Sequence, residues 1–388
     1  MPGYPITAHA LCNATGMTTR DVLAALREGR SGLAPCPAVY GIEAIAGALP
    51  AEPERLPASL ADRDTRIARI LAHSLAELAG PLARARARWG RERVAVILGT
   101  STGGILETEG AYAHQRERGA LPPGYSVERS HALDSVLRVA ATIAEVTGPA
   151  IVVSTACSSS AKVLASARRL LAAGVCDAAL CGGVDTLCRL TLHGFDGLKL
   201  LSRVACRPFS SERAGINIGE GAALMLVERT GEGPARLVGV GESSDAHHMT
   251  APHPEGLGAR LAMERALADA GLPPAAIDQI NAHATGTKQN DVVEGGAIAA
   301  LFGSDVPVVA TKGYNGHLLG AAGATEVIHA IAAIVEGYAP ASVGADPIDP
   351  EIPVDVSAAR RPRATAAVLS NSFAFGGSNV SVVIGGPG

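Results

Sequence analysis

The chain has 388 residues, of which 47% are hydrophobic and 3% aromatic, with 45 glycines and 24 prolines. The aliphatic, glycine-rich composition excludes disorder, collagen and a coiled coil, and a net charge of −4 argues against wholesale nucleic-acid binding. The seven cysteines contain no CxxC pair, which predicts free thiols and a reducing, cytoplasmic location. No signal peptide is expected, since the N-terminus lacks a basic region followed by an apolar core, and no membrane span is expected, since no run of about 18 apolar residues occurs.

Apolar runs typical of buried strands alternate with helix-like segments in the first part of the chain. In chain order, we predict a strand at 94–98, a helix at 130–145 and strands at 149–154 and 178–181, the last two joined by a helix ending near Gly174. Continuous apolar strands alternating with helices indicate an α/β sheet covered on both faces.

A stretch without apolar periodicity, residues 228–235, precedes a second series of the same kind. This series predicts strands at 237–240, 278–283, 307–310, 366–371 and 379–384, and helices at 258–270, 291–302 and 318–336. Each part contains a strand that runs into a turn of small residues. We therefore interpret the chain as two similar halves, residues 1–230 and 231–388.

Cys157 lies between a predicted strand and a predicted helix, and three serines follow it. Unpaired N–H groups and the helix dipole at a helix N-terminus favour negative charge, so this thiol is expected to ionise readily. Because the thiolate is the form that attacks carbonyls, we predict that Cys157 is a nucleophile. Cys176, Cys181 and Cys188 lie in or beside apolar runs and are expected to be buried core residues.

Two histidines lie in segments rich in glycine and threonine. His283 ends a predicted strand, where α/β proteins build their sites, and the hydroxyls of Thr285 and Thr287 can bind a polar ligand arm. Glycines around His317 would allow a substrate to approach closely. One activated cysteine with two histidines suggests acyl-transfer chemistry.

Three further features bear on the site. Lys312 shares the segment of His317, and Glu326 on the following predicted helix can pair with it. The double glycine within residues 373–378 allows a turn that aims a backbone N–H at an oxyanion. The three histidines within residues 247–253 lack the companion ligands of a metal cluster, so no metal site is predicted.

Four motifs occur in a fixed order: Thr-Ala-Cys-Ser-Ser-Ser at 155–160, His-x-Thr-x-Thr at 283–287, Lys-x4-His-x2-Gly-Ala-Ala-Gly at 312–323 and Asn-Ser-Phe-x-Phe-Gly-Gly at 371–377. Together they resemble the β-ketoacyl-acyl carrier protein synthases of the thiolase-like condensing-enzyme superfamily, in the elongating branch with a Cys-His-His site. The resemblance covers nearly the whole chain. It implies a five-layered α-β-α-β-α fold of two related halves.

The resemblance also implies a reaction in two stages. Cys157 accepts an acyl group from a carrier protein, and malonyl-carrier protein then loses CO2 and attacks the acyl-enzyme to give a 3-oxoacyl-carrier protein. His283 and His317 would donate hydrogen bonds to the enolate, while Lys312, paired with Glu326, would orient the site. No metal or bound organic cofactor is expected, because the carrier protein brings its own 4′-phosphopantetheine arm.

The remaining site residues are carried over from the same resemblance. The backbone N–H groups of Cys157 and Phe375 would form the oxyanion hole, and Phe375 would gate substrate entry. Thr285 and Thr287 would hold the pantetheine arm, and Ile216 would line the acyl pocket.

Some positions depart from the family pattern. Ile216 stands where fatty-acid elongating members usually carry phenylalanine, and Ala284 and Ala374 replace glycines common in the family. These changes affect the expected substrate rather than the reaction. Ile216 and the segment 192–198 are also similar to ketosynthases of bacterial aryl-polyene pigment pathways. The sequence leaves the acyl chain length, its saturation and the product class open.

Three rival interpretations were weighed against the residues. A thiolase would carry a second cysteine near the last glycine-rich turn, but no cysteine follows Cys206. An initiating ketosynthase uses Cys-His-Asn, against which His317 argues. A non-elongating partner subunit of the chain-length-factor type would lack the nucleophile, against which Cys157 argues.

The expected partners are an acyl carrier protein and a second subunit, either another copy or a related ketosynthase-like chain. Because such carrier proteins are acidic, a basic patch should surround the tunnel mouth. Arg63, Arg66 and Arg69 share one predicted helix face and are the candidates, with an ordinary solvated face as the alternative.

Overall fold

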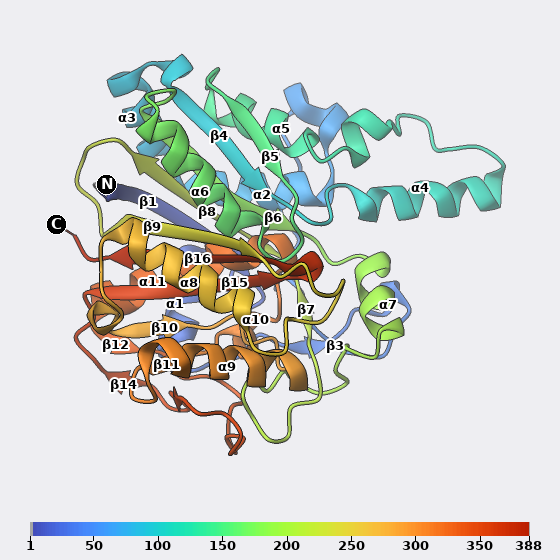
Figure 1. Ribbon diagram of the computed structural model, residues 1–388. Coiled ribbons are helices and arrows are strands. Elements are labelled where there is room, and N and C mark those ends of the chain that lie inside the picture. Colours follow the sequence, from blue (N-terminus) through green and yellow to red (C-terminus); the bar gives the residue numbers. More distant parts are fainter. Residues whose placement is uncertain (1–2, 388) are drawn as a thin grey trace.

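The computed structural model describes residues 3–387, and its main sheet has eleven strands in the order β13-β11-β10-β15-β16-β9-β1-β8-β6-β4-β5 (Figure 1). Their bounds are β1 Tyr4–Asn13, β4 Val94–Gly99, β5 Ala150–Val153, β6 Ala178–Asp185, β8 Gly221–Glu228, β9 Ala235–Ser244, β10 Gln279–Asn281, β11 Pro307–Val309, β13 Asp355–Val356, β15 Ala367–Ala374 and β16 Ser378–Gly385.

The sheet contains two groups of strands with the same pairing pattern. In the first group, β4 pairs in parallel with β5 and β6, and β8 pairs antiparallel with both β6 and β1. In the second, β10 pairs in parallel with β11 and β15, and β16 pairs antiparallel with both β15 and β9. The two halves therefore share one topology, joined where β1 meets β9. The division between residues 230 and 231 stays a prediction.

Helices form three layers around these two groups of strands. Apolar side chains of α6 (Ser159–Ala172) and α11 (Ala322–Glu336) share a central core with both groups. Helices α2 (Arg66–Glu77), α3 (Ala79–Trp89) and α5 (Ser135–Ala144) cover the outer face of the first group. Helices α8 (Leu257–Ala270) and α9 (Lys288–Phe302) cover the outer face of the second. The five-layered α-β-α-β-α fold is thus confirmed.

The central layer explains why α11 is buried along most of its length. Leu319–Glu336 is the one segment among residues 3–387 that is long and apolar enough to cross a membrane, with a mean hydropathy of 1.4, but 83% of it is buried inside the protein. A helix packed between two layers has no solvent face to make polar. Gly323 lets α11 approach α6, since an added Cβ would lie 2.9 Å from the Ala161 Cβ and 2.7 Å from the Ser372 Oγ.

Because of this close approach, a glycine-to-alanine substitution should change the free energy of unfolding in opposite directions at Gly323 and at Gly110. Gly323→Ala should lower the free energy of unfolding by about 1–3 kcal/mol, the usual cost of overpacking a core. Gly110→Ala in α4 (Ile105–Arg118) should raise it by up to about 1 kcal/mol, since alanine favours helices, and no atom lies within 4 Å of the added Cβ. Urea unfolding measures both, and equal effects would contradict the close packing at Gly323.

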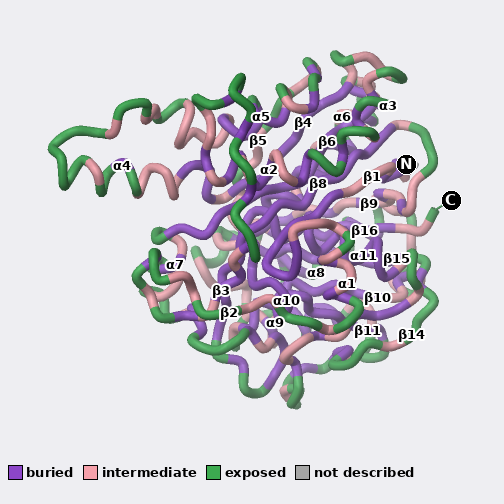
Figure 2. Tube along the Cα trace, turned by 180° about the vertical axis from the view of Figure 1, so that it is seen from behind, coloured by how far each residue is buried: buried purple, intermediate pink, exposed green. Residues whose placement is uncertain are grey.

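The remaining elements lie at the edges of the layers. Helix α4 extends away from the body of the molecule, and its residues are mostly exposed or half-buried (Figures 1 and 2). The helix α1 begins after Thr18, whose hydroxyl accepts the Asp21 N–H, and ends at Gly29 in the left-handed conformation. The other bounds are α1 Thr19–Glu28, α7 Arg189–Gly197, α10 Lys312–Asn315, β2 Ala34–Pro35, β3 Ile45–Gly47, β7 Ile218–Gly219, β12 Tyr338–Ala339 and β14 Arg361–Pro362.

Candidate active site

Cys157 lies in the turn between β5 and α6, two residues before the helix begins. The preceding residue, Ala156, has a left-handed φ of 51°, which is unfavourable for alanine and occurs mainly where surrounding contacts enforce it. Ser159 supplies such contacts, because its Oγ accepts the Thr155 N–H at 2.9 Å and donates to the Ala156 carbonyl at 2.6 Å. The turn thereby fixes the direction of the thiol.

The Cys157 thiol is not the readily ionised group expected from its position near a helix N-terminus. Its side chain is only 7% exposed, and burial raises its pKa to about 12. Lys312 and hydrogen bonds from the backbone N–H groups of Cys157 and Phe375 offset part of this rise. Loss of water around the sulfur outweighs those favourable contacts, so the resting thiol is neutral. The two N–H groups nevertheless point at the sulfur from both halves of the chain.

His283 and His317 lie beside this thiol. His283 follows β10, and His317 follows α10 with its backbone N–H bonded to the Asn217 carbonyl at 2.7 Å. The two imidazole rings meet edge to face at 5.3 Å between centroids. The sulfur of Cys157 and one ring nitrogen of each histidine all lie within 4.8 Å of one another. The structure therefore brings together the three side chains that the sequence motifs singled out.

Both histidines are neutral. Burial lowers the pKa of each well below the ordinary value of 6.5, and the positive charge of Lys312 lowers both further. The Lys312 Nζ lies 3.4 Å from the His283 Nδ1 and also donates to the His283 backbone carbonyl. Because the ammonium can only donate, Nδ1 acts as the acceptor and the His283 proton resides on Nε2.

Lys312 and Glu326 form a buried ion pair at 2.5 Å, with side-chain exposures of 2% and 3%. Burial raises the pKa of Glu326 to about 7, and Lys312 opposes this rise. This pairing was predicted from the sequence, and in the structure Lys312 also contacts His283 and thereby orients it.

The three reactive side chains open onto one cavity of about 390 Å³. Thr285 and Thr287 lie on its wall with their hydroxyls 2.9 Å apart. Phe375 also lines it, and its ring meets that of Phe195 at 5.5 Å between centroids. Further lining residues are Lys199, Leu200, Ile216, Met249, Lys288, Phe373 and Ala374. All candidate site residues except the Lys312–Glu326 pair thus line a single cavity.

Family models match most of the chain. Residues 6–232 match "Beta-ketoacyl synthase, N-terminal domain" and residues 234–346 match "Beta-ketoacyl synthase, C-terminal domain". The chain belongs to the beta-ketoacyl synthase family. It is therefore a ketosynthase, an acyltransferase of the condensing type.

This ketosynthase has relatives among both curated proteins and solved structures. The 3-oxoacyl-[acyl-carrier-protein] synthase 2 of Mycobacterium bovis is 37% identical over 312 residues, which cover 76% of this chain and 74% of that protein. Nodulation protein E of Rhizobium meliloti is 33% identical over 384 residues, 94% of each chain. A chain of the complex between the ketosynthase ApeO and its chain length factor ApeC from Xenorhabdus doucetiae superposes with a TM-score of 0.93 and 38% identity, covering 99% of this chain and 98% of that one.

Two residues that hold His283 in this ketosynthase were not found from the sequence. Both carboxylate oxygens of Glu294 accept backbone N–H groups at 2.8 Å, from His283 and Ala284. Asn371 donates to the same carboxylate at 3.2 Å. Burial raises the pKa of Glu294 to about 7. The only signal in the sequence was a carboxylate among apolar residues and glycines, at the seventh residue of α9.

Asp185 supports the turn of Cys157 through Ser101, and its role was not predicted from the sequence. This buried carboxylate ends β6 and accepts hydrogen bonds from Thr100 Oγ1 at 2.8 Å and from the backbone N–H groups of Ser101 and Thr102 at 2.9 and 2.7 Å. The Ser101 hydroxyl in turn donates to the Ala156 carbonyl at 3.0 Å. The carboxylate thus holds the turn that carries the nucleophile.

The two alanines that replace family glycines differ in their backbone conformation. Ala284 has a φ of 37°, in the left-handed region where glycine is preferred, and the backbone N–H groups of His283 and Ala284, which donate to the Glu294 carboxylate, hold this segment. Ala374 has an extended φ of −127°, which any residue adopts. Only the substitution at residue 284 therefore strains the backbone.

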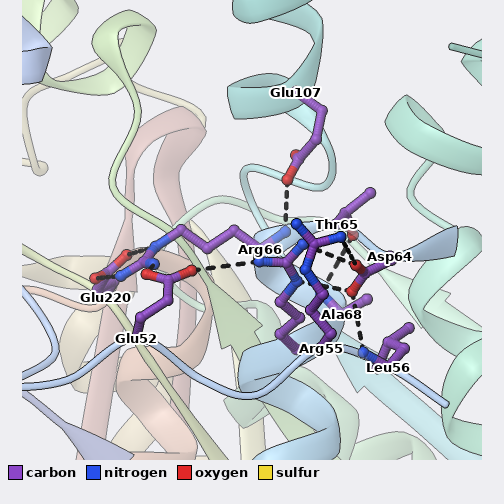
Figure 3. A network of polar contacts seen from close by, with 10 residues as sticks. Glu52, Arg55, Leu56, Asp64, Thr65, Arg66, Ala68, Glu107 and Glu220 are labelled. Atoms are coloured by element: carbon purple, nitrogen blue, oxygen red, sulfur yellow. Dashed lines mark hydrogen bonds and ion pairs between the residues drawn. The ribbon is translucent and has the colours of Figure 1, made fainter. Parts of the chain in front are cut away.

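The expected basic patch of Arg63, Arg66 and Arg69 is wrong. Arg66 is half-buried between Glu52 and Glu220, and its Nη2 lies 2.6 Å from Glu220, whose side chain is 1% exposed (Figure 3). Arg69 pairs with Asp64 at 2.7 Å. None of the three arginines lines the cavity. Helical spacing placed them on one face, but it could not show that carboxylates from other segments already neutralise two of them.

Proposed function

We propose that this ketosynthase joins an acyl group held on Cys157 to malonyl-carrier protein by decarboxylative Claisen condensation, giving a 3-oxoacyl-carrier protein and CO2. The observation that carries the proposal is the sulfur of Cys157 with ring nitrogens of His283 and His317 within 4.8 Å of one another in one cavity. Acyl transfer needs a nucleophile, and decarboxylation needs donors for the enolate oxygen.

The first stage moves the acyl group from the carrier thioester to Cys157. Because the thiol is neutral, its proton passes to a neighbouring neutral imidazole as the sulfur attacks the carbonyl. The N–H groups of Cys157 and Phe375 stabilise the developing oxyanion. The tetrahedral intermediate then expels the carrier's thiolate, which takes that proton back, and the site returns to two neutral histidines.

The second stage uses the histidines as donors. His283 donates from Nε2 to the malonyl thioester oxygen, and His317 donates beside it, so both stabilise the enolate that forms as CO2 leaves. The carbanion attacks the acyl-Cys157 carbonyl, and the Cys157 sulfur leaves as a thiolate that takes up one proton from solvent. Neutral imidazoles suit this role, because they donate without protonating the carbanion.

The histidine pKa shifts give this stage a distinctive pH dependence. In the Cys157→Gln variant, malonyl decarboxylation should stay constant from about pH 8 down to about pH 6, since both imidazoles remain neutral well below their ordinary pKa of about 6.5. Release of CO2 from malonyl-carrier protein measures the rate. A fall with a midpoint near pH 6.5 would mean that at least one histidine titrates normally.

We further propose the surroundings in which the enzyme works. The substrate arrives on the 4′-phosphopantetheine arm of an acidic acyl carrier protein, with the arm lying against Thr285 and Thr287 and the carrier near Lys199 and Lys288 at the cavity. The enzyme needs no resident metal or organic cofactor. It works in the cytoplasm as a dimer with itself or with a chain-length-factor subunit, and the ApeO–ApeC complex supports the second arrangement.

The acyl pocket favours a primer other than a standard fatty acyl chain, and we propose an aryl-polyene type of substrate. Ile216 lines the cavity where a larger phenylalanine is usual, beside Leu200 and Phe195. Ile216→Phe should lower kcat/KM for long or aryl primers about tenfold or more, because a filled pocket loses the space of several methylenes. Ile216→Val, the matched control, should change it little. If both variants showed equal kcat/KM for all primers, the side chain of residue 216 would not determine which primer the pocket accepts.

The alternative function is a partner subunit of the chain-length-factor type that does not itself elongate. Cys157 and the two facing histidines favour the elongating role. Iodoacetamide alkylation separates the two: alkylating a partner-only subunit would leave the reconstituted pathway active, whereas alkylating Cys157 of an elongating subunit stops it.

Product analysis tests the proposed function as a whole. The enzyme is offered malonyl-carrier protein with a panel of saturated, unsaturated and aryl acyl-carrier proteins, and carrier-bound products are identified by mass spectrometry. A 3-oxoacyl product two carbons longer than its primer supports the proposal, and the preferred primer names the pathway. No elongated product from any primer, with the partner subunit present, would contradict it.

A further inference from the structure

We propose that Cys157, His317 and His283 also form a binding site for a thiophilic divalent cation of the Zn²⁺ type, which blocks the nucleophile while bound. Binding rests on geometry alone, whereas the resulting inhibition rests on the proposed role of Cys157 as the acyl acceptor. The three side chains come from separate segments of both halves, and each offers one ligand atom within 4.8 Å of the others.

The donor set matches the preference of zinc. Zn²⁺ binds thiolate sulfur at about 2.3 Å and imidazole nitrogen at about 2.0–2.1 Å, so tetrahedral ligand atoms stand roughly 3.3–3.6 Å apart. Small rotations of three side chains would close the observed spacing to that range. Sites with three protein ligands leave a fourth position open, and here the cavity supplies water to it.

His317 provides the independent observation that points to a ligand. Its side chain is 0% exposed, and neither ring nitrogen has a hydrogen-bond partner among the residues that the structure describes. Buried polar atoms rarely remain unpaired, because desolvation without a new partner costs about 1–3 kcal/mol. A bound cation satisfies one nitrogen of this ring directly, as a substrate oxygen does during turnover.

Lys312 is expected to lower the affinity of the site for the cation. When His283 binds through Nε2, its proton moves to Nδ1, which faces the Lys312 Nζ at 3.4 Å. Lys312 must then rely on its other two acceptors, the His283 carbonyl and Glu326. The ammonium also repels the cation. Lys312→Met should therefore strengthen metal binding, an effect that a merely damaged site would not produce.

Binding exchanges a proton for the metal without any redox step. The thiol of Cys157 loses its proton to solvent as the sulfur–metal bond forms, so one proton is released per cation. The metal-bound sulfur cannot attack a thioester. Metal at about ten times its dissociation constant leaves roughly a tenth of the sites free, so acylation or alkylation of Cys157 should slow about tenfold.

Cobalt titration of the metal-free, fully reduced protein tests the site spectroscopically. We expect one equivalent of Co²⁺ to produce a thiolate-to-cobalt charge-transfer band that disappears in Cys157→Ala, weakens in His317→Ala and forms at lower Co²⁺ in Lys312→Met. The pair of the exposed His247 and the half-buried His253, whose rings lie 5.1 Å apart, is the competing site, so His247→Ala/His253→Ala is the matched control and should keep the band. Added Zn²⁺ should displace Co²⁺.

The same titration distinguishes the two proposals. Absence of a thiolate band, or a band unchanged in Cys157→Ala, overturns the metal site. An alkylation rate of Cys157 that does not change at saturating Zn²⁺ overturns it as well. If the metal-free enzyme is acylated on Cys157 but binds no metal, only this inference fails. If metal binds Cys157 but the metal-free enzyme is never acylated there, the proposed function fails and the metal site stands.

Discussion

Cys157→Ala should abolish condensation, lowering kcat by about 10⁴-fold or more, as removal of a covalent nucleophile does in other enzymes. No other cysteine can replace it, because Cys157 alone among the seven lines the cavity. Carrier-bound product measured by mass spectrometry gives the rate. Substantial elongation by the alanine variant would show that the nucleophile has been assigned to the wrong residue.

Two companion variants separate loss of the nucleophile from damage to the site. Cys157→Gln should keep malonyl decarboxylation while losing condensation, since His283 and His317 remain as donors. Cys188→Ala, at another buried cysteine that does not line the cavity, should keep activity within a few-fold of the original enzyme. Loss of decarboxylation in Cys157→Gln would mean that the histidines do not act independently of the thiol.

Lys312→Met should lower the free energy of unfolding by about 3–5 kcal/mol, because it leaves Glu326 buried without its counter-ion. It also removes the donor to the His283 Nδ1 and carbonyl, so decarboxylation should fall together with stability. Arg27→Met, at the more exposed pair with Glu336, is the matched control and should cost about 0–1 kcal/mol.

A double variant separates the effect of Lys312 on the orientation of His283 from its effect on the stability of the protein. Lys312→Met/Glu326→Leu replaces both charges with apolar groups, a change that is often nearly neutral for buried pairs. We expect much of the stability to return while decarboxylation stays low, because His283 still lacks its donor. Thermal unfolding and CO2 release measure the two effects. If stability and decarboxylation both recovered, Lys312 would have only a structural role.

The parts of this enzyme that were predictable from its sequence are those where a local pattern of apolar residues marks a strand or helix and a reactive residue follows it directly. Cys157, His283 and Phe375 each follow an apolar run that becomes a strand, and strand ends gather at the same edge of a sheet. Helices 258–270 and 291–302 were expected within three residues of the observed bounds of α8 and α9, and each is followed directly by a glycine, a common C-terminal boundary of a helix.

What the sequence analysis missed depends on contacts between distant segments. Strands β1 and β8 lie near the centre of the sheet, yet neither was predicted. In β1, threonine, histidine and asparagine interrupt the apolar residues, whereas the apolar run 222–227 of β8 is typical of a buried strand and was overlooked. The roles of Asp185 and Glu294 arise only when other segments bring their N–H groups to these carboxylates. The pKa of Cys157 is decided in the same way, because burial by both halves outweighs the local helix terminus.

The most direct test of the whole account is mass analysis of the enzyme itself. The purified protein is mixed with an acyl-carrier protein, quenched in acid and digested, and the peptide containing Cys157 is weighed. We predict an added acyl mass on that peptide alone, which disappears when malonyl-carrier protein is supplied. An acyl group found on a different residue, or none on Cys157 although elongated product accumulates, would contradict the account.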